Sequence, residues 1–515
     1  MPNIAHWIAR WAAEAGDRIA IVDPEGKLDY RGLADRSRRL SGWLRAQDIR
    51  PGERVALLLK NGHVYIESVM ALAQVGAIGI PVNWRLSPRE IAFLLDDSGC
   101  SLVIHSAEFS PLVTASREQS QGAPRTLEVG GARDSYEKAL AETPPDPGIE
   151  DLSGEAAMTL MYTSGTTGQP KGALLPHRKT LYNSINAQHY FGIRENDRVL
   201  AMTPLFHSLA LNILALPVLY TGASIHFHAD FEPEAVWDRV ERERLTYLGG
   251  VPTQYLALIE SLEERRSRGR LPDLDSLRFL FTAGAAISTE IIHRFEKYGL
   301  VLKQGYGQTE TSVLTCLEGR DAVRKAGSVG RPVANAEIRI VVPGTLDREP
   351  SQWQNCAAGE VGEIVVRGPI TMLGYWNRPQ DTAETLRGEW LRTTDLAYAD
   401  EEGFLTLVGR TRDMIISGGE NVYPAEVEEV LSQHEDIREV AVVGIPDEKW
   451  GEVGRAHVVL EPDRPLDAEA IRTWARERLA GFKIPKEFCA EAALPRTASG
   501  KVLKFRLQAT GHNDA

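Results

Sequence analysis

Residues 162–172 read Tyr-Thr-Ser-Gly-Thr-Thr-Gly-Gln-Pro-Lys-Gly, with three glycines, four serine or threonine residues and one lysine. Glycine lets a backbone approach a ligand closely. Successive N–H and hydroxyl groups form a concavity for anions, and lysine adds a point charge for phosphate. The composition predicts a phosphate-binding loop, with a flexible surface turn as the alternative. A Walker loop is excluded, because the second glycine of that pattern is replaced by Pro170.

Two further stretches of small residues, 282–286 and 304–310, each follow an apolar segment that predicts a strand. Loops at the carboxyl ends of adjacent parallel strands are common ligand sites. Together they predict a slot for a flat base, with Tyr306 as a stacking surface. Glu310 is a candidate oxygen ligand for Mg²⁺. Taken singly, such corners indicate close packing, and Glu310 stands where a dinucleotide fingerprint requires glycine.

The second half of the chain has three more candidate segments. Asp395 and Arg410 flank a predicted strand pair, and both are able to hydrogen-bond a ribose. Residues 417–424 form a glycine-containing turn before a helix, and Lys501 follows a glycine near the end of the chain. Taken singly, these features indicate a turn cap, a sharp bend and a solvated charge.

The elements that position these residues are visible in the hydrophobic pattern. Strand-like and helix-like segments alternate over residues 54–105 and again over residues 199–304, which predicts two doubly wound parallel sheets. After residue 327, strand-like segments separated by turns predict a smaller antiparallel or barrel-like subdomain. Beyond residue 413 a compact α+β unit is expected. The predicted fold class is therefore α/β.

Composition limits the possible functions. The chain has 515 residues, too many for one core, and its 43% hydrophobic and 25% charged residues are typical of a soluble globular protein. A net charge of -13 argues against a general nucleic-acid binder. The four cysteines are scattered without a Cys-x-x-Cys pair, which favours a reducing cytoplasm. No apolar run is long enough to cross a bilayer. Peripheral membrane contact and a homodimer stay open.

In their order and spacing, these motifs resemble those of the adenylate-forming enzymes, the superfamily of acyl-CoA synthetases and luciferases, over nearly the whole chain. Within it, residues 414–424 and 446–451 are most similar to acyl-CoA ligases. The resemblance implies a large N-terminal domain of three subdomains, residues 1–411, which binds ATP and the acyl substrate. It implies a mobile C-terminal domain, residues 412–515, which carries Lys501 and is joined at a hinge near Arg412.

The resemblance also implies the ATP site. The β and γ phosphates are expected to be held by Thr163, Ser164, Gly165, Thr166, Thr167, Gly168 and Lys171. The adenine side is expected to be framed by Gly284, Ala285, Ala286, Gly305, Tyr306, Gly307, Gln308 and Thr309. Asp395 and Arg410 are expected to hold the ribose, and Glu310 with Thr163 to hold Mg²⁺.

The remaining implied roles concern the acid and the thiol. Lys501 is expected to bridge the substrate carboxylate and the α-phosphate. Gly418 and Gly419 are expected to line the pantetheine passage for CoA. An acyl pocket is expected at His207, Val251 and Pro252.

Two residues depart from the family pattern. Arg412 stands where the hinge residue is usually lysine or aspartate. Thr394 replaces the glycine of the more common Thr-Gly-Asp and narrows the backbone freedom beside Asp395.

The expected reaction converts an acid, ATP and CoA into acyl-CoA, AMP and pyrophosphate through an acyl-AMP. The walls around His207 are expected to be largely aliphatic with few aromatic partners, which favours a medium- or long-chain fatty acid. A cinnamate- or benzoate-like aryl acid is the alternative substrate, and an acyl-AMP ligase that loads a carrier protein is an alternative activity. A non-catalytic nucleotide-binding protein is the alternative of another class. A serine hydrolase is disfavoured because no Gly-x-Ser-x-Gly elbow is present.

Overall fold

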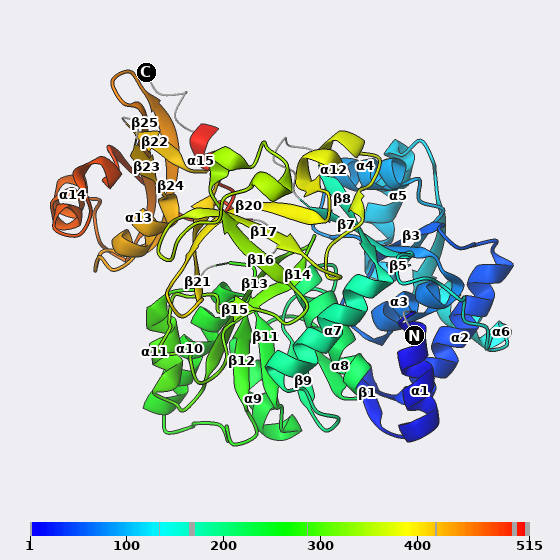
Figure 1. The fold of residues 1–515 in the computed structure, drawn as a ribbon. Coiled ribbons are helices and arrows are strands. Elements are labelled where there is room, and N and C mark those ends of the chain that lie inside the picture. The colour runs from blue at the N-terminus through cyan, green and yellow to red at the C-terminus, as the bar shows by residue number, and fades with distance from the viewer. Residues whose placement is uncertain are drawn as a thin grey trace. The chain divides into compact units, whose positions relative to one another are not determined.

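The computed structural model describes residues 3–132, 134–163, 170–285, 287–411, 413–417, 420–496 and 502–509 (Figure 1). The chain divides into two compact units. The first comprises Met1–Ala326, Pro332–Glu337 and Arg367–Leu391, and the second comprises Gly327–Arg331, Ile338–Val366 and Arg392–Ala515. The boundary expected between residues 411 and 412 stays a prediction.

One sheet of the first unit has the strand order β18-β8-β7-β4-β3-β5-β6. Its strands are β3 (Arg54–Leu58), β4 (Ile78–Pro81), β5 (Leu102–Ser106), β6 (Arg125–Val129), β7 (Ala157–Thr163), β8 (Lys171–Pro176) and β18 (Gly374–Tyr375). The strands from β7 to β6 run parallel, and β7 and β8 form an antiparallel pair. The doubly wound pattern predicted for this region is confirmed.

Helices connect these strands, and one of them, α4 (Pro88–Ser98), begins with a capping signal visible in the sequence. The connecting helices also include α3 (His63–Val75) and α5 (Ser110–Gln119). Ser87 caps α4 and Glu90 completes a capping box, because each side chain accepts a hydrogen bond from the other residue's backbone N–H. Ile80, Val82 and Leu94 pack in the apolar core beside this sheet.

A second sheet in the first unit has the order β14-β13-β12-β11-β9-β10-β1-β2. Its strands are β1 (Ile19–Asp23), β2 (Gly26–Asp29), β9 (Arg198–Ala201), β10 (Ser224–Phe227), β11 (Tyr247–Gly250), β12 (Phe279–Thr282), β13 (Leu302–Gln308) and β14 (Ser312–Cys316). The strands from β13 to β1 are parallel. One expectation is corrected: the strand predicted to end near residue 304 continues to Gln308 and returns antiparallel as β14.

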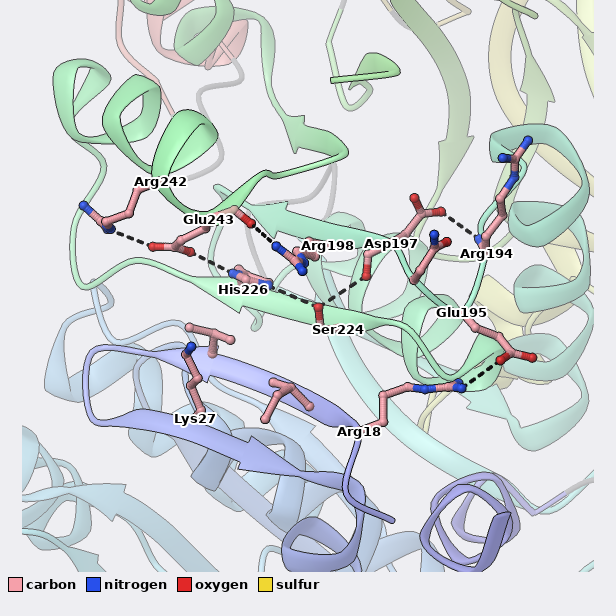
Figure 2. A pocket seen from close by; sticks show the side chains of 13 residues that line it. Arg18, Lys27, Arg194, Glu195, Asp197, Arg198, Ser224, His226, Arg242 and Glu243 are labelled. Atoms are coloured by element: carbon pink, nitrogen blue, oxygen red, sulfur yellow. Dashed lines mark hydrogen bonds and ion pairs between the residues drawn. The ribbon is translucent and has the colours of Figure 1, made fainter. Parts of the chain in front are cut away.

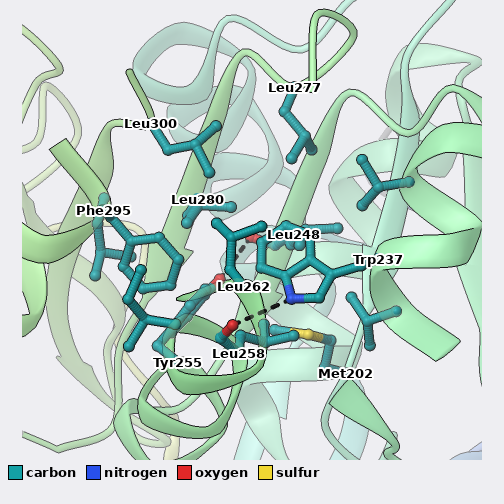
Figure 3. Close-up of a cluster of buried hydrophobic side chains, with 14 of the residues drawn as sticks. Met202, Trp237, Leu248, Tyr255, Leu258, Leu262, Leu277, Leu280, Phe295 and Leu300 are labelled. Carbon is teal, nitrogen blue, oxygen red and sulfur yellow. Dashed lines mark hydrogen bonds between the residues drawn. The ribbon is translucent and has the colours of Figure 1, made fainter. Parts of the chain in front are cut away.

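The core under this sheet is formed by large apolar side chains from α9 (Pro233–Glu243), α10 (Pro252–Ser267) and α11 (Thr289–Glu296), as Figure 3 shows. The indole N–H of Trp237 donates to the Leu258 carbonyl over 3.1 Å. The hydroxyl of Tyr255 lies 2.8 Å from the carbonyl oxygens of Leu248 and Phe281, on neighbouring strands. This core fixes the strands whose following loops carry the predicted site.

Other elements of the first unit complete its layers. They are α1 (Ala5–Ala15), α2 (Tyr30–Ala46), the 3-10 helix η1 (Ala107–Phe109), α6 (Ser135–Glu142), α7 (His177–Phe191), the π-helix η2 (Leu209–Ala215), α8 (Leu216–Thr221), α12 (Pro379–Thr385) and β19 (Leu386–Arg387). The short strand β15 (Arg331–Pro332) lies at a boundary between the units. In the part of the chain that is described, no helix combines the length and apolar character needed to cross a membrane.

The second unit begins with a sheet built from β16 (Glu337–Val341), β17 (Gly362–Arg367), β20 (Trp390–Ala399) and β21 (Leu405–Arg410). Strand β20 pairs antiparallel with β21. The 3-10 helices η3 (Pro343–Thr345) and η4 (Pro350–Gln352) lie between β16 and β17.

The α+β part follows as expected. It contains β22 (Ile415–Ser417), β23 (Glu420–Val422), α13 (Pro424–Leu431), β24 (Ile437–Asp447), β25 (Gly451–Leu460), α14 (Ala468–Arg476), η5 (Gly481–Lys483), β26 (Glu487–Ala490) and α15 (Lys504–Ala509). The two long strands β24 and β25 form one antiparallel pair. Taken together, the two units confirm the predicted α/β fold with its smaller C-terminal α+β domain.

Candidate active site

The predicted phosphate loop connects two paired strands of the first unit. Thr163 ends β7, Lys171 begins β8, and the two residues face each other in the antiparallel register. The hydroxyl of Thr163 donates to the Lys171 carbonyl over 3.4 Å. The two ends of the loop are therefore held together. Its central residues, Ser164, Gly165, Thr166, Thr167 and Gly168, lie outside the described residues.

Lys171 and Glu310 meet at one tyrosine. The ammonium of Lys171 contacts the Asp381 carboxylate and lies 5.8 Å from the ring centroid of Tyr375. The Tyr375 hydroxyl donates to Glu310 Oε1 over 2.9 Å. Burial, reinforced by the Glu310 carboxylate, raises the pKa of Tyr375, so its hydroxyl stays a donor. The structure thus brings together the predicted phosphate lysine and the predicted metal ligand.

The sequence does not point to Tyr375 or Asp381. Lys171 and Asp381 are 210 positions apart, and Tyr375 and Glu310 are 65 apart. Tyr375 lies on the two-residue strand β18, which pairs with β8 next to Lys171. A strand of this length leaves no periodic pattern, so no local signal identifies the tyrosine.

Behind Glu310 lies a buried lysine that the sequence also does not single out. Lys179 on α7 is 1% exposed, and its ammonium contacts the Ser312 hydroxyl. Burial lowers the pKa of Lys179 to about 7, against the attraction of the Glu310 carboxylate. Glu310 itself is 9% exposed. The Lys179 amine therefore contacts the end of the turn between β13 and β14, and Glu310 lies within that turn.

The residues predicted to frame adenine come from adjacent parallel strands. Thr282 of β12 lies level with Gln304 of β13. Gly284 and Ala285 are exposed just after β12. They share an edge of the sheet with the residues predicted on β13, namely Gly305, Tyr306, Gly307 and Gln308. Ala286 lies outside the described residues.

The turn after β13 is tight. A Cβ on Gly307 would lie 1.7 Å from the Ser312 carbonyl oxygen, so no other residue fits there. The backbone N–H of Gln308 donates to the Thr311 hydroxyl over 3.0 Å, which closes the turn that holds Thr309 and Glu310. Tyr306 is 7% exposed. This close packing fixes the direction in which Glu310 leaves the sheet.

The predicted acyl-site residues follow the next strands along the same edge. Strand β11 lies between β12 and β9. Val251 and Pro252 come directly after β11, and the Val251 N–H donates to Gln254 Oε1 over 3.2 Å. Gln254 in turn donates to the Met202 carbonyl, after β9, over 2.8 Å. The structure therefore gathers the predicted adenine and acyl segments in neighbouring loops.

His207 lies just before the π-helix η2, and its surroundings include aromatic rings. Its centroid is 4.5 Å from that of Phe206, which is 6.1 Å edge-to-face from Trp84. Burial, with a smaller effect of Arg85, lowers the pKa of His207 to about 4. Its enclosed Nε2 has no hydrogen-bond partner among the described residues. The ring contact at His207 is with Phe206, and the expectation of largely aliphatic walls with few aromatic partners stays a prediction.

The loop before His207 is held by a residue from the other sheet. Asn61, between β3 and α3, donates to the Thr203 carbonyl over 2.9 Å and accepts from the Leu205 N–H over 2.7 Å. The amide thus satisfies both a donor and an acceptor of this loop. The partners are more than 140 positions away in the sequence, so the sequence alone does not reveal this role.

In the second unit, the predicted ribose residues are paired. Asp395 on β20 lies opposite Arg410 on β21, and Arg410 Nε is 2.9 Å from Asp395 Oδ1. Thr394, beside Asp395, has φ +60°, a conformation that a β-branched residue rarely adopts. The remaining predicted residues, Arg412, Gly418, Gly419 and Lys501, lie outside the described residues.

A separate cavity of about 910 Å³ opens at the amino ends of β9 and β10, away from the loops that carry the predicted residues (Figure 2). In it, Ser224 Oγ is 3.1 Å from His226 Nε2, and His226 Nδ1 is 2.9 Å from Glu243 Oε2. The order of groups is that of a serine hydrolase. However, Arg239 and Arg242 also bind the Glu243 carboxylate, and burial lowers the pKa of His226. The imidazole is therefore a weak base, and we assign this cavity no catalytic role.

The chain matches the family of AMP-binding enzymes over residues 8–376 and their C-terminal domain over residues 426–501. It belongs to this family and is an AMP-forming acid–CoA ligase that uses ATP.

Three relatives show the extent of the similarity. A feruloyl-CoA synthase of Amycolatopsis sp is 40% identical over 506 residues, 98% of each chain. The long-chain-fatty-acid–CoA ligase FadD13 of Mycobacterium tuberculosis is 33% identical over 512 residues, 99% of this chain and 98% of the relative. The solved structure of o-succinylbenzoate CoA synthetase from Bacillus subtilis with its acyl-adenylate intermediate has a TM-score of 0.86 at 32% identity and covers 100% of this chain and 98% of that one.

Proposed function

We propose that the acid activated by this ligase carries an aromatic ring, as in cinnamate- or ferulate-like acids. The observation that carries the proposal is a chain of ring contacts at the His207 loop: the ring centroid of Phe206 is 4.5 Å from that of the imidazole, and Trp84 is edge-to-face with Phe206. Edge-to-face and offset ring pairs add about 1 kcal/mol beyond the burial of apolar area. The 40% identity to a feruloyl-CoA synthase supports the same substrate class.

A fatty acid is the second candidate. It is favoured by the apolar residues of η2, which are buried beside the His207 loop, and by the 33% identity to a long-chain-fatty-acid–CoA ligase. An open aliphatic tunnel gains about 0.8 kcal/mol for each methylene that it buries. The rate should then rise with chain length until the chain outgrows the tunnel.

The proposed roles of the ATP-side residues follow from charge. The carboxylate of the acid and the α-phosphate of ATP repel each other, so cations must reduce this repulsion while the two groups are held in line. Lys171 is assigned to the β and γ phosphates, and Lys501 to the carboxylate and α-phosphate. Asp395 and Arg410 are assigned to the ribose hydroxyls. Attack by a carboxylate oxygen on the α-phosphorus expels pyrophosphate and leaves acyl-AMP, and the CoA thiol then displaces AMP.

Mg²⁺ is implied by the family, and Glu310 with the Thr163 hydroxyl is proposed to hold it. Among the residues that the structure covers, no cluster of three or more His, Cys, Asp or Glu side chains could hold a metal ion without further ligands. A single buried carboxylate nevertheless fits, because protein-bound Mg²⁺ usually takes one or two carboxylates and completes its shell with phosphate and water oxygens. When bound, the ion would neutralise charge on the phosphates. Tyr375 orients the Glu310 carboxylate through its 2.9 Å hydrogen bond.

The test is a comparison of acids. Purified protein with ATP, Mg²⁺ and CoA is assayed with ferulate, cinnamate, benzoate and fatty acids of graded length, and kcat/KM is measured for each. We expect ferulate or cinnamate to be preferred. A steady rise of kcat/KM along the fatty-acid series, with inert aryl acids, would show that the second candidate is right.

A substitution at Trp84 distinguishes a loss of aromatic contact with the acid from general damage to the protein. Trp84→Leu should lower kcat/KM for aryl acids several-fold, because about 1 kcal/mol of ring contact is lost, and should change the fatty-acid values less. Trp474→Leu, at another half-buried tryptophan in the C-terminal part of the second unit, is the matched control. Equal losses for both classes of acid in Trp84→Leu would contradict an aromatic pocket beside His207.

A further inference from the structure

Helix α7 buries an unusual number of polar side chains. Its buried residues include His177, Lys179, Thr180, Asn183, Ser184 and Asn186. Polar groups are costly to bury unless they find partners. A helix that faces the core is normally apolar on its buried side. The burial of these polar side chains therefore needs another reason. The helix packs against β14, η2 and α8 in the first unit (Figure 1).

Lys179 contacts the hairpin that carries Glu310. Its ammonium donates to the hydroxyl of Ser312, which begins β14 with φ +58° and is 1% exposed. The carbonyl of Ser312 lies against Gly307 on the facing strand, so the two strands of the hairpin are too close for a side chain at position 307. Glu310 lies two residues before Ser312. The position of Ser312 therefore constrains the backbone from which the Glu310 carboxylate extends.

One turn further along α7, Asn183 contacts two elements at once. Its Oδ1 accepts from the Val313 N–H of β14 over 3.3 Å, and its Nδ2 donates to the Asn212 carbonyl over 2.5 Å. Asn212 belongs to the π-helix η2, directly after His207. A π-helix has altered backbone hydrogen bonding and is common at functional sites. Asn183 therefore connects the His207 side of the site with the hairpin of Glu310.

Helix α7 also follows, and contacts, the strand that begins at Lys171. Strand β8 begins at Lys171 and leads without a break into α7, whose N-cap is Pro176. One rigid helix thus has contacts with the Lys171 strand, with the Glu310 hairpin and with the segment after His207. A helix transmits a displacement along its length because its backbone hydrogen bonds keep the turns in register.

We propose that Lys179 and Asn183 are positioning residues that couple acid binding beside η2 to the geometry of the ATP side at Glu310. This inference rests on the proposed function, which assigns the acid to the His207 side and Mg²⁺ to Glu310. Acid that presses on η2 displaces the Asn212 carbonyl, and Asn183 passes the displacement to Val313. Lys179 holds the adjacent Ser312, so the turn responds as one body.

The coupling is measurable as a change in nucleotide affinity. Calorimetry gives the Kd of Mg²⁺ and an ATP analogue that cannot be cleaved between the α and β phosphates, without acid and with saturating ferulate or octanoate. We expect either acid to tighten binding several-fold in the unmodified enzyme. In Asn183→Ala this factor should fall to about one, while the Kd without acid changes less than the coupling. In Lys179→Met the Kd should rise about tenfold in both conditions, the loss expected for one misplaced charged contact.

Control variants distinguish the proposed coupling from general effects of substitution. Gln188→Ala, on the exposed face of α7, should behave as the unmodified enzyme. Ser312→Ala removes the Lys179 contact from the other side, so it tests the same contact if Lys179→Met does not fold, and the double variant should be no worse than the worse single one. An unchanged coupling factor in Asn183→Ala, or no coupling in the unmodified enzyme, would refute the inference.

The same binding experiment tests the proposed metal role of Glu310 separately. Glu310→Gln should remove the Mg²⁺ dependence of analogue binding. If it does not, the metal role of Glu310 fails whatever α7 does. Coupling with octanoate but not with ferulate would overturn the aryl substrate and leave the coupling intact.

Discussion

Thr394 has a backbone conformation that its side chain disfavours. Its φ of +60° lies in the left-handed region, which glycine enters freely and β-branched residues rarely. The Thr394 carbonyl accepts from the Thr411 N–H over 2.9 Å and from the Thr411 hydroxyl over 3.3 Å. Thr394, which replaces the glycine of the family pattern, therefore leaves the backbone strained next to Asp395.

Replacing this residue should relieve the strain. Thr394→Gly is expected to raise the thermal unfolding midpoint, because removing a left-handed Cβ conflict returns about 1 kcal/mol and exceeds the entropy cost of glycine. Asn377→Gly is the matched control, since Asn377 has φ +51° and asparagine tolerates this region. A midpoint that falls in Thr394→Gly, or rises equally in Asn377→Gly, would exclude strain at Thr394.

His177 is a second residue with a measurable consequence. Burial lowers its pKa from 6.5 to about 4, it is 0% exposed, and both ring nitrogens lack partners within the described ranges. The unfolded chain therefore binds a proton between pH 6.5 and 4 that the folded protein does not bind. The free energy of unfolding therefore falls as pH drops through this window, and the loss is constant below it.

Removing this titration should flatten the pH dependence. His177→Gln is expected to lose roughly 3 kcal/mol less unfolding free energy than the unmodified protein as pH falls through the window. Urea unfolding at a series of pH values between 6.5 and 4 measures the difference. His189→Gln, at an exposed histidine of the same helix, controls for general effects. Parallel curves for His177→Gln and the unmodified protein would contradict the assignment.

Among the loops, the segment before His207 depends on an element of the other sheet. Asn61 holds Thr203 and Leu205 through both atoms of its amide. The adjacent His63 is fixed in turn, since its backbone N–H donates to Asp23 Oδ2 over 2.8 Å. The β3–α3 loop is therefore a support for the predicted acyl site.

Loss of this support should affect the acid more than ATP. Asn61→Ala is expected to raise KM for the acid and lower kcat about tenfold, because small misplacements of a positioning loop cost one to two powers of ten. The KM for ATP should stay within about twofold. Asn196→Ala, exposed at the opposite edge of the second sheet, is the control in the same assays. Equal changes in both KM values would indicate general damage instead.

For the whole enzyme, acyl-AMP formation and thioester formation can be measured separately, and the predicted role of Lys501 belongs to the first step. Lys501 is the cation that the family resemblance assigns to both reacting anions. Lys501→Ala should slow acyl-AMP formation roughly 10²–10³-fold, the usual loss for one donor to a transition state. Conversion of supplied acyl-AMP to the thioester should survive much better. Pyrophosphate release and thioester formation, measured separately, test this, and equal losses in both steps would refute the assignment.

Much of the fold follows from patterns within single elements. The alternation predicted over residues 54–105 begins with β3 and α3, because strands and helices each leave an apolar pattern along a few residues or turns. The capping box at Ser87 is equally local. The extension of β13 to Gln308 was not predictable, since Gly305 and Gly307 read as a turn until the pairing with β14 is known.

The sequence by itself predicts a phosphate loop at 162–172, ribose contacts by Asp395 and Arg410 and a metal role for Glu310, because each prediction depends on residue types and their order within short segments; these roles stay predictions. Three-dimensional packing alone supplied Tyr375 at Glu310 and Asn61 at the His207 loop. Their contacts join positions 65 and more than 140 residues apart, and a hydrogen bond at that separation leaves no periodicity for a local pattern to carry. The proposed acid preference also rests on packing, because it depends on which side chains the fold gathers around one histidine.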